Sequence, residues 1–133
     1  MRSLLLASDW YLVGLSVTVA LVIYPSFRLV GKAQWLSFHR AHTRTIAIAV
    51  APAWALQLAT TLWWLRRGPQ HHWAPLHLGF ALAAVLLTVL RAVPLHARLE
   101  RRHDDHDVAL LLRWHWLRTL AWVGAALVAL GAP

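Results

Sequence analysis

Four long apolar runs separated by basic segments dominate the sequence. They cover about residues 10–30, 45–65, 76–95 and 108–130, and a helix of about 20 residues spans a hydrocarbon core about 30 Å thick. Of the 133 residues, 59% are hydrophobic and only 14% are charged, whereas soluble domains carry about a quarter charged residues. The sequence therefore predicts a single all-α domain over residues 1–133, an integral membrane protein built as an antiparallel four-helix transmembrane bundle.

The net charge of +8 could suggest a nucleic-acid-binding protein, but the positions of the charges indicate otherwise. The basic residues flank the apolar runs, where Lys and Arg set topology and meet anionic lipid head groups. They do not line one face of a soluble domain. We therefore exclude nucleic acid and expect the lipid bilayer as a partner. The absence of cysteine excludes disulfides, thiolate nucleophiles and cysteine-ligated metal sites.

The distribution of Lys and Arg predicts the orientation in the membrane. Gly68-Pro69 predicts a turn in the loop between the second and third runs. Three basic residues lie on the side of this loop and of the two termini: Arg2, Arg66 and Arg67. The other ten lie at the opposite side: Arg28, Lys32, Arg40, Arg44, Arg91, Arg98, Arg101, Arg102, Arg113 and Arg118. Because positive residues concentrate on the cytoplasmic side, we expect the two longer loops in the cytoplasm and both termini outside it.

Six of the nine histidines fall at this predicted cytoplasmic end: His39, His42, His96, His103, His106 and His115. His39 and His42 are three residues apart, so on a helix they share a face and could bind one metal or simply face the head groups. His96 and His115 lie deeper, where an ionisable residue is costly and usually functional. These four are the candidate ligands of haem iron or of a non-haem metal ion, unless they are hydrogen-bonded interior histidines.

The stretch His103–Asp107, HDDHD, combines imidazoles and carboxylates as some metal sites do. We favour a plainer interpretation. The stretch then forms a solvated turn whose acids balance neighbouring arginines, and Asp107 caps the last helix.

Arg118 lies three residues after His115 and can share its helix face. If Arg118 points inward, it would bind a carboxylate, such as that of a porphyrin propionate or of an acidic substrate. Otherwise it extends to the head groups. Trp114 and Trp116 flank His115 and suit either a stacked flat ligand or an interfacial belt. The expected ligand is therefore a small hydrophobic or porphyrin-like molecule.

Several short motifs resemble those of known membrane proteins: Tyr24-Pro25-x-Phe27, the His39/His42 pair, Pro52, Val93-Pro94-x-His96 and Trp116-x-Arg118-Thr119. Together they resemble a family of small uncharacterised bacterial four-span membrane proteins. The layout is more distantly similar to HemJ-type protoporphyrinogen oxidases and anthrone-oxygenase-like membrane proteins. The resemblance implies a bacterial inner-membrane location and a site with two histidines, matched by His39 or His42 and by His96. Gln57, where that family has an acid, and His115, where it has Asn, depart from the pattern.

These observations lead to one functional hypothesis and one alternative. The hypothesis is a haem- or metal-binding, oxidoreductase-like membrane protein with its site at the cytoplasmic end, formed by His96, His39, His42, His115 and Arg118. Haem is the first cofactor expectation and a non-haem metal ion the second. The alternative is a non-catalytic subunit of a larger membrane complex or a homo-oligomer, because Ala- and Gly-rich stretches in the last two runs permit close helix contacts.

Overall fold

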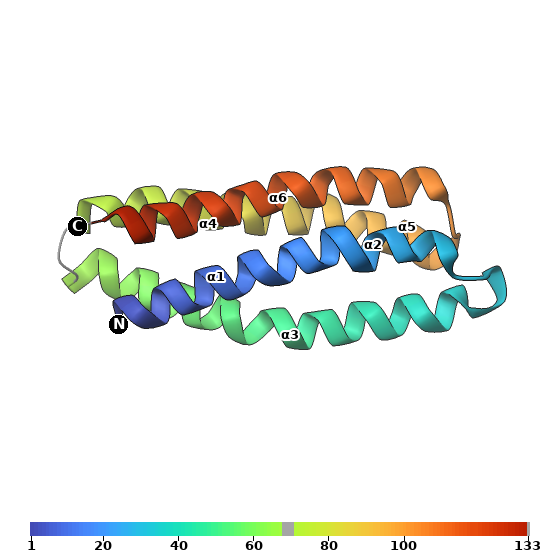
Figure 1. The fold of residues 1–133 in the computed structure, drawn as a ribbon, viewed down its shortest axis with the longest axis horizontal. Coiled ribbons are helices and arrows are strands. Elements are labelled where there is room, and N and C mark those ends of the chain that lie inside the picture. The colour runs from blue at the N-terminus through green and yellow to red at the C-terminus, as the bar shows by residue number, and fades with distance from the viewer. Residues whose placement is uncertain (68–70, 133) are drawn as a thin grey trace.

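The computed structural model describes residues 1–67 and 71–132, and within these ranges the chain is helical and contains no strand. Four long helical segments follow one another along the chain (Figure 1). The all-α fold predicted from the four apolar runs is confirmed. The turn predicted at Gly68-Pro69 lies outside the described residues.

The first segment consists of α1 (Arg2–Thr18), a π-helical turn η1 (Val19–Ile23), α2 (Tyr24–Ser26) and a 3₁₀ turn η2 (Phe27–Leu29). It begins eight residues earlier than the predicted start at Trp10 and buries Asp9. Pro25 has no N–H to continue the helical hydrogen-bond ladder, and the widened turn η1 comes directly before it.

The second segment is α3 (Lys32–Arg67), which continues without a break through Pro52. Residues 32–44, which lie between the first two apolar runs, therefore extend the second run as helix. As a result His39 and His42 lie on the same helix as Gln57.

The third segment repeats the local pattern of the first. It consists of a 3₁₀ turn η3 (His71–Trp73), α4 (Ala74–Leu87), a π-helical turn η4 (Thr88–Ala92) and α5 (Val93–Arg101). Pro94 follows η4 as Pro25 follows η1. Such π-helical turns are frequent at functional sites, and here both lie just before the residues that form the site.

The fourth segment is α6 (Asp105–Gly131), and its N-cap is Asp104 rather than the predicted Asp107. Asp104 has an extended backbone conformation, and its carboxylate accepts the backbone N–H groups of His106 and Asp107 at 2.9 and 3.2 Å. Asp107 instead pairs with Arg98, and Asp104 also pairs with Arg102 at 2.6 Å. Asp104 and Asp107 thus balance arginines, as predicted, but residues 105–107 form the first turn of α6 instead of a solvated turn.

The two termini lie together at one end of the molecule, which we call the terminal end (Figure 1). There Arg2 donates hydrogen bonds to the carbonyl oxygens of Leu130 and Ala132 at 3.1 and 2.6 Å. Residues 30–31 and 102–104 lie at the opposite end, which we call the loop end. In packing, α6 lies along α4 and α1, and α1 lies along α3, whereas α3 touches α4 and α5 more sparsely.

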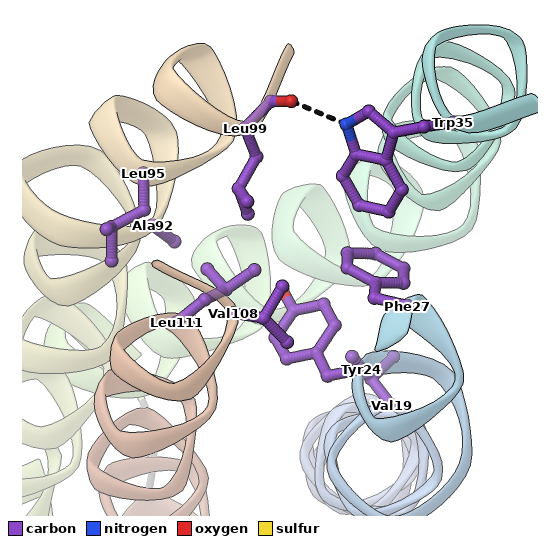
Figure 2. Close-up of a cluster of buried hydrophobic side chains, with 9 residues drawn as sticks. All are labelled: Val19, Tyr24, Phe27, Trp35, Ala92, Leu95, Leu99, Val108 and Leu111. Atoms are coloured by element: carbon purple, nitrogen blue, oxygen red, sulfur yellow. Dashed lines mark hydrogen bonds between the residues drawn. The ribbon is translucent and has the colours of Figure 1, made fainter. Parts of the chain in front are cut away.

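Three buried apolar clusters follow one another from the loop end to the terminal end. Figure 2 shows the first, in which Tyr24 and Phe27 meet Trp35 of α3 and Leu99 of α5. The indole N–H of Trp35 donates to the carbonyl oxygen of Leu99 at 2.6 Å (Figure 2). Val108 and Leu111 of α6 belong to the same cluster, which therefore ties all four helical segments together.

Three of the helical segments are long and apolar enough to cross a membrane by length and composition: Arg2–Leu29, Lys32–Arg67 and Ala74–Arg101. Their outward faces are apolar as well. Leu21, Ile48 and Leu90, one on each segment, are 62%, 67% and 62% exposed, and large exposed apolar surface marks contact with lipid or protein. These features suggest a membrane protein.

Candidate functional site

A hydrogen-bonded chain of three side chains crosses the loop end of the bundle. Tyr24 Oη lies 3.2 Å from His96 Nε2, and His96 Nδ1 lies 3.0 Å from His39 Nε2. Tyr24 is held by α2, His39 by α3 and His96 by α5, so each of the first three helical segments contributes one member. Both ring nitrogens of His96 are therefore hydrogen-bonded within the protein.

His42 lies beside this chain, one helical turn after His39. The ring centroids of His39 and His42 lie 5.2 and 5.9 Å from that of His96. Two nitrogens of the pair, His39 Nδ1 and His42 Nε2, are buried without a hydrogen-bond partner in the described part of the chain. The histidine pair predicted from the sequence thus meets His96 and keeps two free coordinating atoms.

His115 and Arg118 complete the group from α6. His115 Nε2 lies 2.8 Å from the carbonyl oxygen of Ser16, so this nitrogen carries the proton and donates it. His115 Nδ1 then accepts from Arg118 Nη2 at 2.5 Å. These two bonds fix His115 as a neutral imidazole with no free nitrogen. We call Tyr24, His39, His42, His96, His115 and Arg118 the Tyr24 cluster.

Arg118 has no acidic partner among the ion pairs of the described residues. Its Nη1 donates to Thr88 Oγ1 at 3.2 Å, and its Nε is buried without a hydrogen-bond partner there. Burying a cation without a carboxylate partner lowers the stability of the fold, and a buried N–H without an acceptor is rare in native proteins. Both features of Arg118 are explained if a ligand supplies the partner.

A cavity of about 490 Å³ lies between α3 and the α4–α5 segment, a volume within the usual range of small-molecule sites, about 300–1,000 Å³. Its polar lining includes Tyr24, His39, His96 and Arg118, and its apolar lining includes Trp54. Trp54 Nε1, like Arg118 Nε, is buried without a partner among the described residues. Trp54 and Arg118, each with a buried N–H that lacks a partner, therefore both line one largely apolar cavity, which suits a hydrophobic ligand with a polar group.

The residues fit a haem or metal ion only in part. Within the described ranges, no group of three or more His, Asp or Glu side chains is arranged to hold a metal ion. His96 and His115 use both ring nitrogens within the protein, whereas His39 Nδ1 and His42 Nε2 are unpaired. An iron or metal ion bound here would therefore take its imidazole ligands from His39 and His42, and Arg118 would hold a carboxylate of the cofactor.

Other predicted candidates lie apart from the cavity. The ring of His103 stacks on that of Trp35, with centroids 4.1 Å apart and 12° between the planes, and His106 is exposed. The Arg91 guanidinium lies over the ring of Trp114 at 4.7 Å, a cation–π contact. Trp116 is 38% exposed, which suits an interfacial belt.

Sequence reasoning assigned no site role to Tyr24 or Trp54, and it missed a second polar cluster at the terminal end. We call Asp9, Gln57, Thr61 and His77 the Asp9 cluster. The signal that could have pointed to it was Asp9, an acid between the apolar residues 4–7 and the first long apolar run. His77 Nε2 lies 3.0 Å from Asp9 Oδ2, and Gln57 Nε2 donates to Asp9 Oδ1 at 2.6 Å. Asp9 and His77 are both fully buried.

The polar side chains of the Asp9 cluster are linked to one another. The Thr61 hydroxyl donates to the carbonyl oxygen of Gln57 at 2.7 Å, and its oxygen lies 3.2 Å from His77 Nδ1. Both ring nitrogens of His77 therefore have a partner within the cluster, Thr61 on one side and Asp9 on the other.

No protein-family model, curated protein or solved structure matches this chain. The class is therefore defined by the fold and the site alone. It is an all-helical protein with three helices apolar enough to span a membrane and a cavity lined by tyrosine, histidine and arginine.

Proposed function

We propose that the chain is an integral membrane protein that binds a flat, lipid-soluble carboxylic acid, porphyrin-like in shape and charge, in the loop-end cavity. In this proposal four antiparallel spans cross a bacterial inner membrane, with the loop end in the cytoplasm and both termini outside. The apolar outward faces and the excess of Lys and Arg at the loop end support this orientation.

The class of ligand is inferred from Arg118, which has no countercharge. Arg118 lines the cavity, has no acidic partner in the described residues, and has a buried Nε without a hydrogen-bond partner there. A ligand carboxylate would supply the missing countercharge and accept a charge-assisted hydrogen bond. The rest of the wall, with Ile46, Val50 and Trp54, is apolar and matches a hydrophobic ligand body.

The test is binding of 1-pyrenebutyric acid to the protein purified in detergent, followed by pyrene fluorescence. We expect the acid to bind at least tenfold more tightly than its methyl ester, because the ester cannot pair with a guanidinium. Arg118→Gln should remove this preference, and Arg113→Gln, at an exposed arginine of the same helix, should keep it. Equal binding of acid and ester to the unsubstituted protein would overturn the proposal.

A haem- or metal-dependent oxidoreductase is the second candidate function. It is favoured by one observation, the unpaired buried nitrogens of His39 and His42, which are chemically suited to a metal ion. When bound, haem or a redox-active metal ion would supply electron transfer, and in the case of haem Arg118 would hold a propionate carboxylate.

The test is an absorption spectrum of the purified protein before and after dithionite, with metal analysis of the same sample. A Soret band that shifts on reduction and is lost in His42→Ala supports a haem protein. A stoichiometric metal without that band supports a non-haem centre. A folded, colourless and metal-free sample from cells supplied with haem would contradict both. If that sample also shows no preference for the acid, a non-catalytic subunit of a membrane complex becomes the leading function.

A further inference from the structure

We propose that the ligand reaches Arg118 from the bilayer, through an opening between α3 and α5 that small side chains keep passable. We call this opening the slot, and it is bordered by Ala47 and Ala51 of α3 and by Val93 and Ala97 of α5. This inference rests on the proposed function. It adds to that function the phase from which the ligand is taken and the residues that control its entry.

The slot is the apolar part of the exposed rim of the cavity. Tyr24, His39 and Ala92 line the cavity and are buried. The exposed lining residues are Ala47, Ala51, Val93, Ala97 and Glu100. Residues four apart lie on the same face of a helix, one turn from each other, so residues 47 and 51 form one edge and residues 93 and 97 the other. The cavity therefore opens along a line between two helices, and three of the four side chains beside that line are methyl groups.

Larger apolar side chains flank the slot on both helices. Ile48, next to Ala47, is 67% exposed, and Leu90, three residues before Val93, is 62% exposed. Both edges of the slot belong to segments that are long and apolar enough to cross a membrane. In the proposed orientation these outward side chains face lipid, and the slot connects the lipid with the cavity.

The loop end of the cavity is tied across, in contrast to the slot. Arg40 of α3 pairs with Glu100 of α5 at 2.7 Å, and the indole N–H of Trp35 donates to the carbonyl oxygen of Leu99. An ion pair therefore has to open before a ligand can pass Glu100 from the water. The alanine and valine side chains of the slot form no such link, so entry from the bilayer breaks no polar contact.

The direction of the cavity suits a ligand that is already aligned with lipid chains. On α3 the lining runs from Thr43 to Trp54, which is about 16 Å along the helix axis at 1.5 Å per residue. In the proposed orientation this axis follows the acyl chains of the bilayer. A flat acid can therefore pass edge-on between the two helices without turning, and Arg118 then binds its carboxylate.

The slot is tested with a thiol, because the chain contains no cysteine of its own. Ala51→Cys is placed in proteoliposomes and modified with benzyl methanethiosulfonate, which adds a ring that dithiothreitol removes. We expect modification to slow both association and dissociation of 1-pyrenebutyric acid at least tenfold in stopped-flow fluorescence and to change Kd less than threefold, because a narrower entrance slows both directions equally.

The same thiol provides the controls. Dithiothreitol should restore both rates, which a misfolded protein would not do, and methyl methanethiosulfonate should slow them less than the benzyl reagent. Ala59→Cys is the matched variant, since Ala59 is exposed on α3 but does not line the cavity, and its modification should leave the rates unchanged.

A second measurement identifies the phase from which the ligand enters. At a fixed amount of acid, the association rate should follow the amount of acid per lipid and not its concentration in water. Arg40→Gln, which removes the ion pair at the loop end, should leave the rate unchanged.

Three results would overturn the slot alone, with Arg118-dependent binding intact. They are unchanged rates in modified Ala51→Cys, a loss of affinity there with a normal association rate, and a rate that follows the acid in water or rises in Arg40→Gln. Binding that does not depend on Arg118 would overturn the proposed function instead.

Discussion

The two polar clusters inside this bundle are built from similar residues but differ in how completely they are satisfied. In the Asp9 cluster, the carboxylate, the imidazole, the amide nitrogen and the hydroxyl each have a partner within the cluster. In the Tyr24 cluster, His39 Nδ1, His42 Nε2 and Arg118 Nε have none among the described residues. The satisfied cluster has zero exposure at Asp9 and His77, whereas Tyr24, His39, His96 and Arg118 of the unsatisfied one line a cavity of about 490 Å³.

Buried polar groups can serve either to hold helices together or to bind a ligand, and the difference in satisfaction distinguishes the two. A satisfied network fixes how helices pack, and breaking it costs stability. An unsatisfied group is retained at a cost in stability when a ligand supplies the missing partner. We therefore assign the Asp9 cluster to stability and the Tyr24 cluster to binding, and the following predictions test that assignment from the largest expected effect to the smallest.

Removing one partner of the buried Asp9–His77 pair should have the largest effect. Asp9→Ala leaves the buried imidazole and the Gln57 amide without an acceptor, and we expect a loss of about 3–5 kcal/mol in the free energy of unfolding. Thermal unfolding in detergent measures it. The double variant Asp9→Leu with His77→Phe removes both partners and should lose clearly less. Equal losses would show that the pair itself does not hold the helices together.

Packing between α4 and α6 should be the next most sensitive feature. A Cβ on Gly124 would lie 2.7 Å from ring carbons of Phe80, so Gly124→Ala forces that ring to move, at a cost of about 1–3 kcal/mol. Gly79→Ala is the matched control, because a Cβ there meets no atom within 4 Å. The tight contact between α4 and α6 contrasts with the contact between α3 and α5, where the cavity lies. A neutral Gly124→Ala would mean that Phe80 moves aside freely into its partly exposed surroundings.

Arg118→Met should change stability little, in contrast to Asp9→Ala. The substitution removes a partly buried cation that has no carboxylate partner, which stabilises the fold, but it also removes the donor to His115, which destabilises it. These two effects offset each other, and we expect the free energy of unfolding to change by less than about 1 kcal/mol. Binding of 1-pyrenebutyric acid should fall at least tenfold in the same variant. A large loss of stability would place Arg118 with the structural groups instead.

The smallest expected effect is the pH dependence of the α6 N-cap. Backbone N–H groups of Asp107 and His106 and the nearby Arg102 lower the pKa of the Asp104 carboxyl, with the Asp107 N–H contributing most. Because the folded pKa is depressed, the stabilisation is fully present above the unfolded value of about 3.9 and is lost as the pH falls through the lower folded value. Unfolding measured from pH 6 to pH 2 should show a shallower decline in Asp104→Ala.

The fold was more predictable from the sequence than the site. Four apolar runs of helical length leave few alternatives to a helical membrane protein, and the all-helical chain follows. The α6 cap was misplaced by three residues because Asp104, Asp105 and Asp107 are equally good capping residues in sequence. Only the extended backbone at Asp104 selects it. Tyr24 and Trp54 were not assigned because aromatic residues in a membrane helix are usually belt or packing residues.

The sequence by itself determined the four apolar runs, the basic excess at one end and the gathering of histidines there. All three depend on composition and spacing along the chain. Only the tertiary structure decided which histidine and arginine nitrogens form hydrogen bonds within the protein and which have no partner. That outcome depends on the rotation of each helix about its axis, which packing between helices sets. Hence His96 and His115 use both ring nitrogens in hydrogen bonds within the protein, while His39, His42 and Arg118 keep unpaired buried atoms. We place the ligand in the cavity that His39 and Arg118 line.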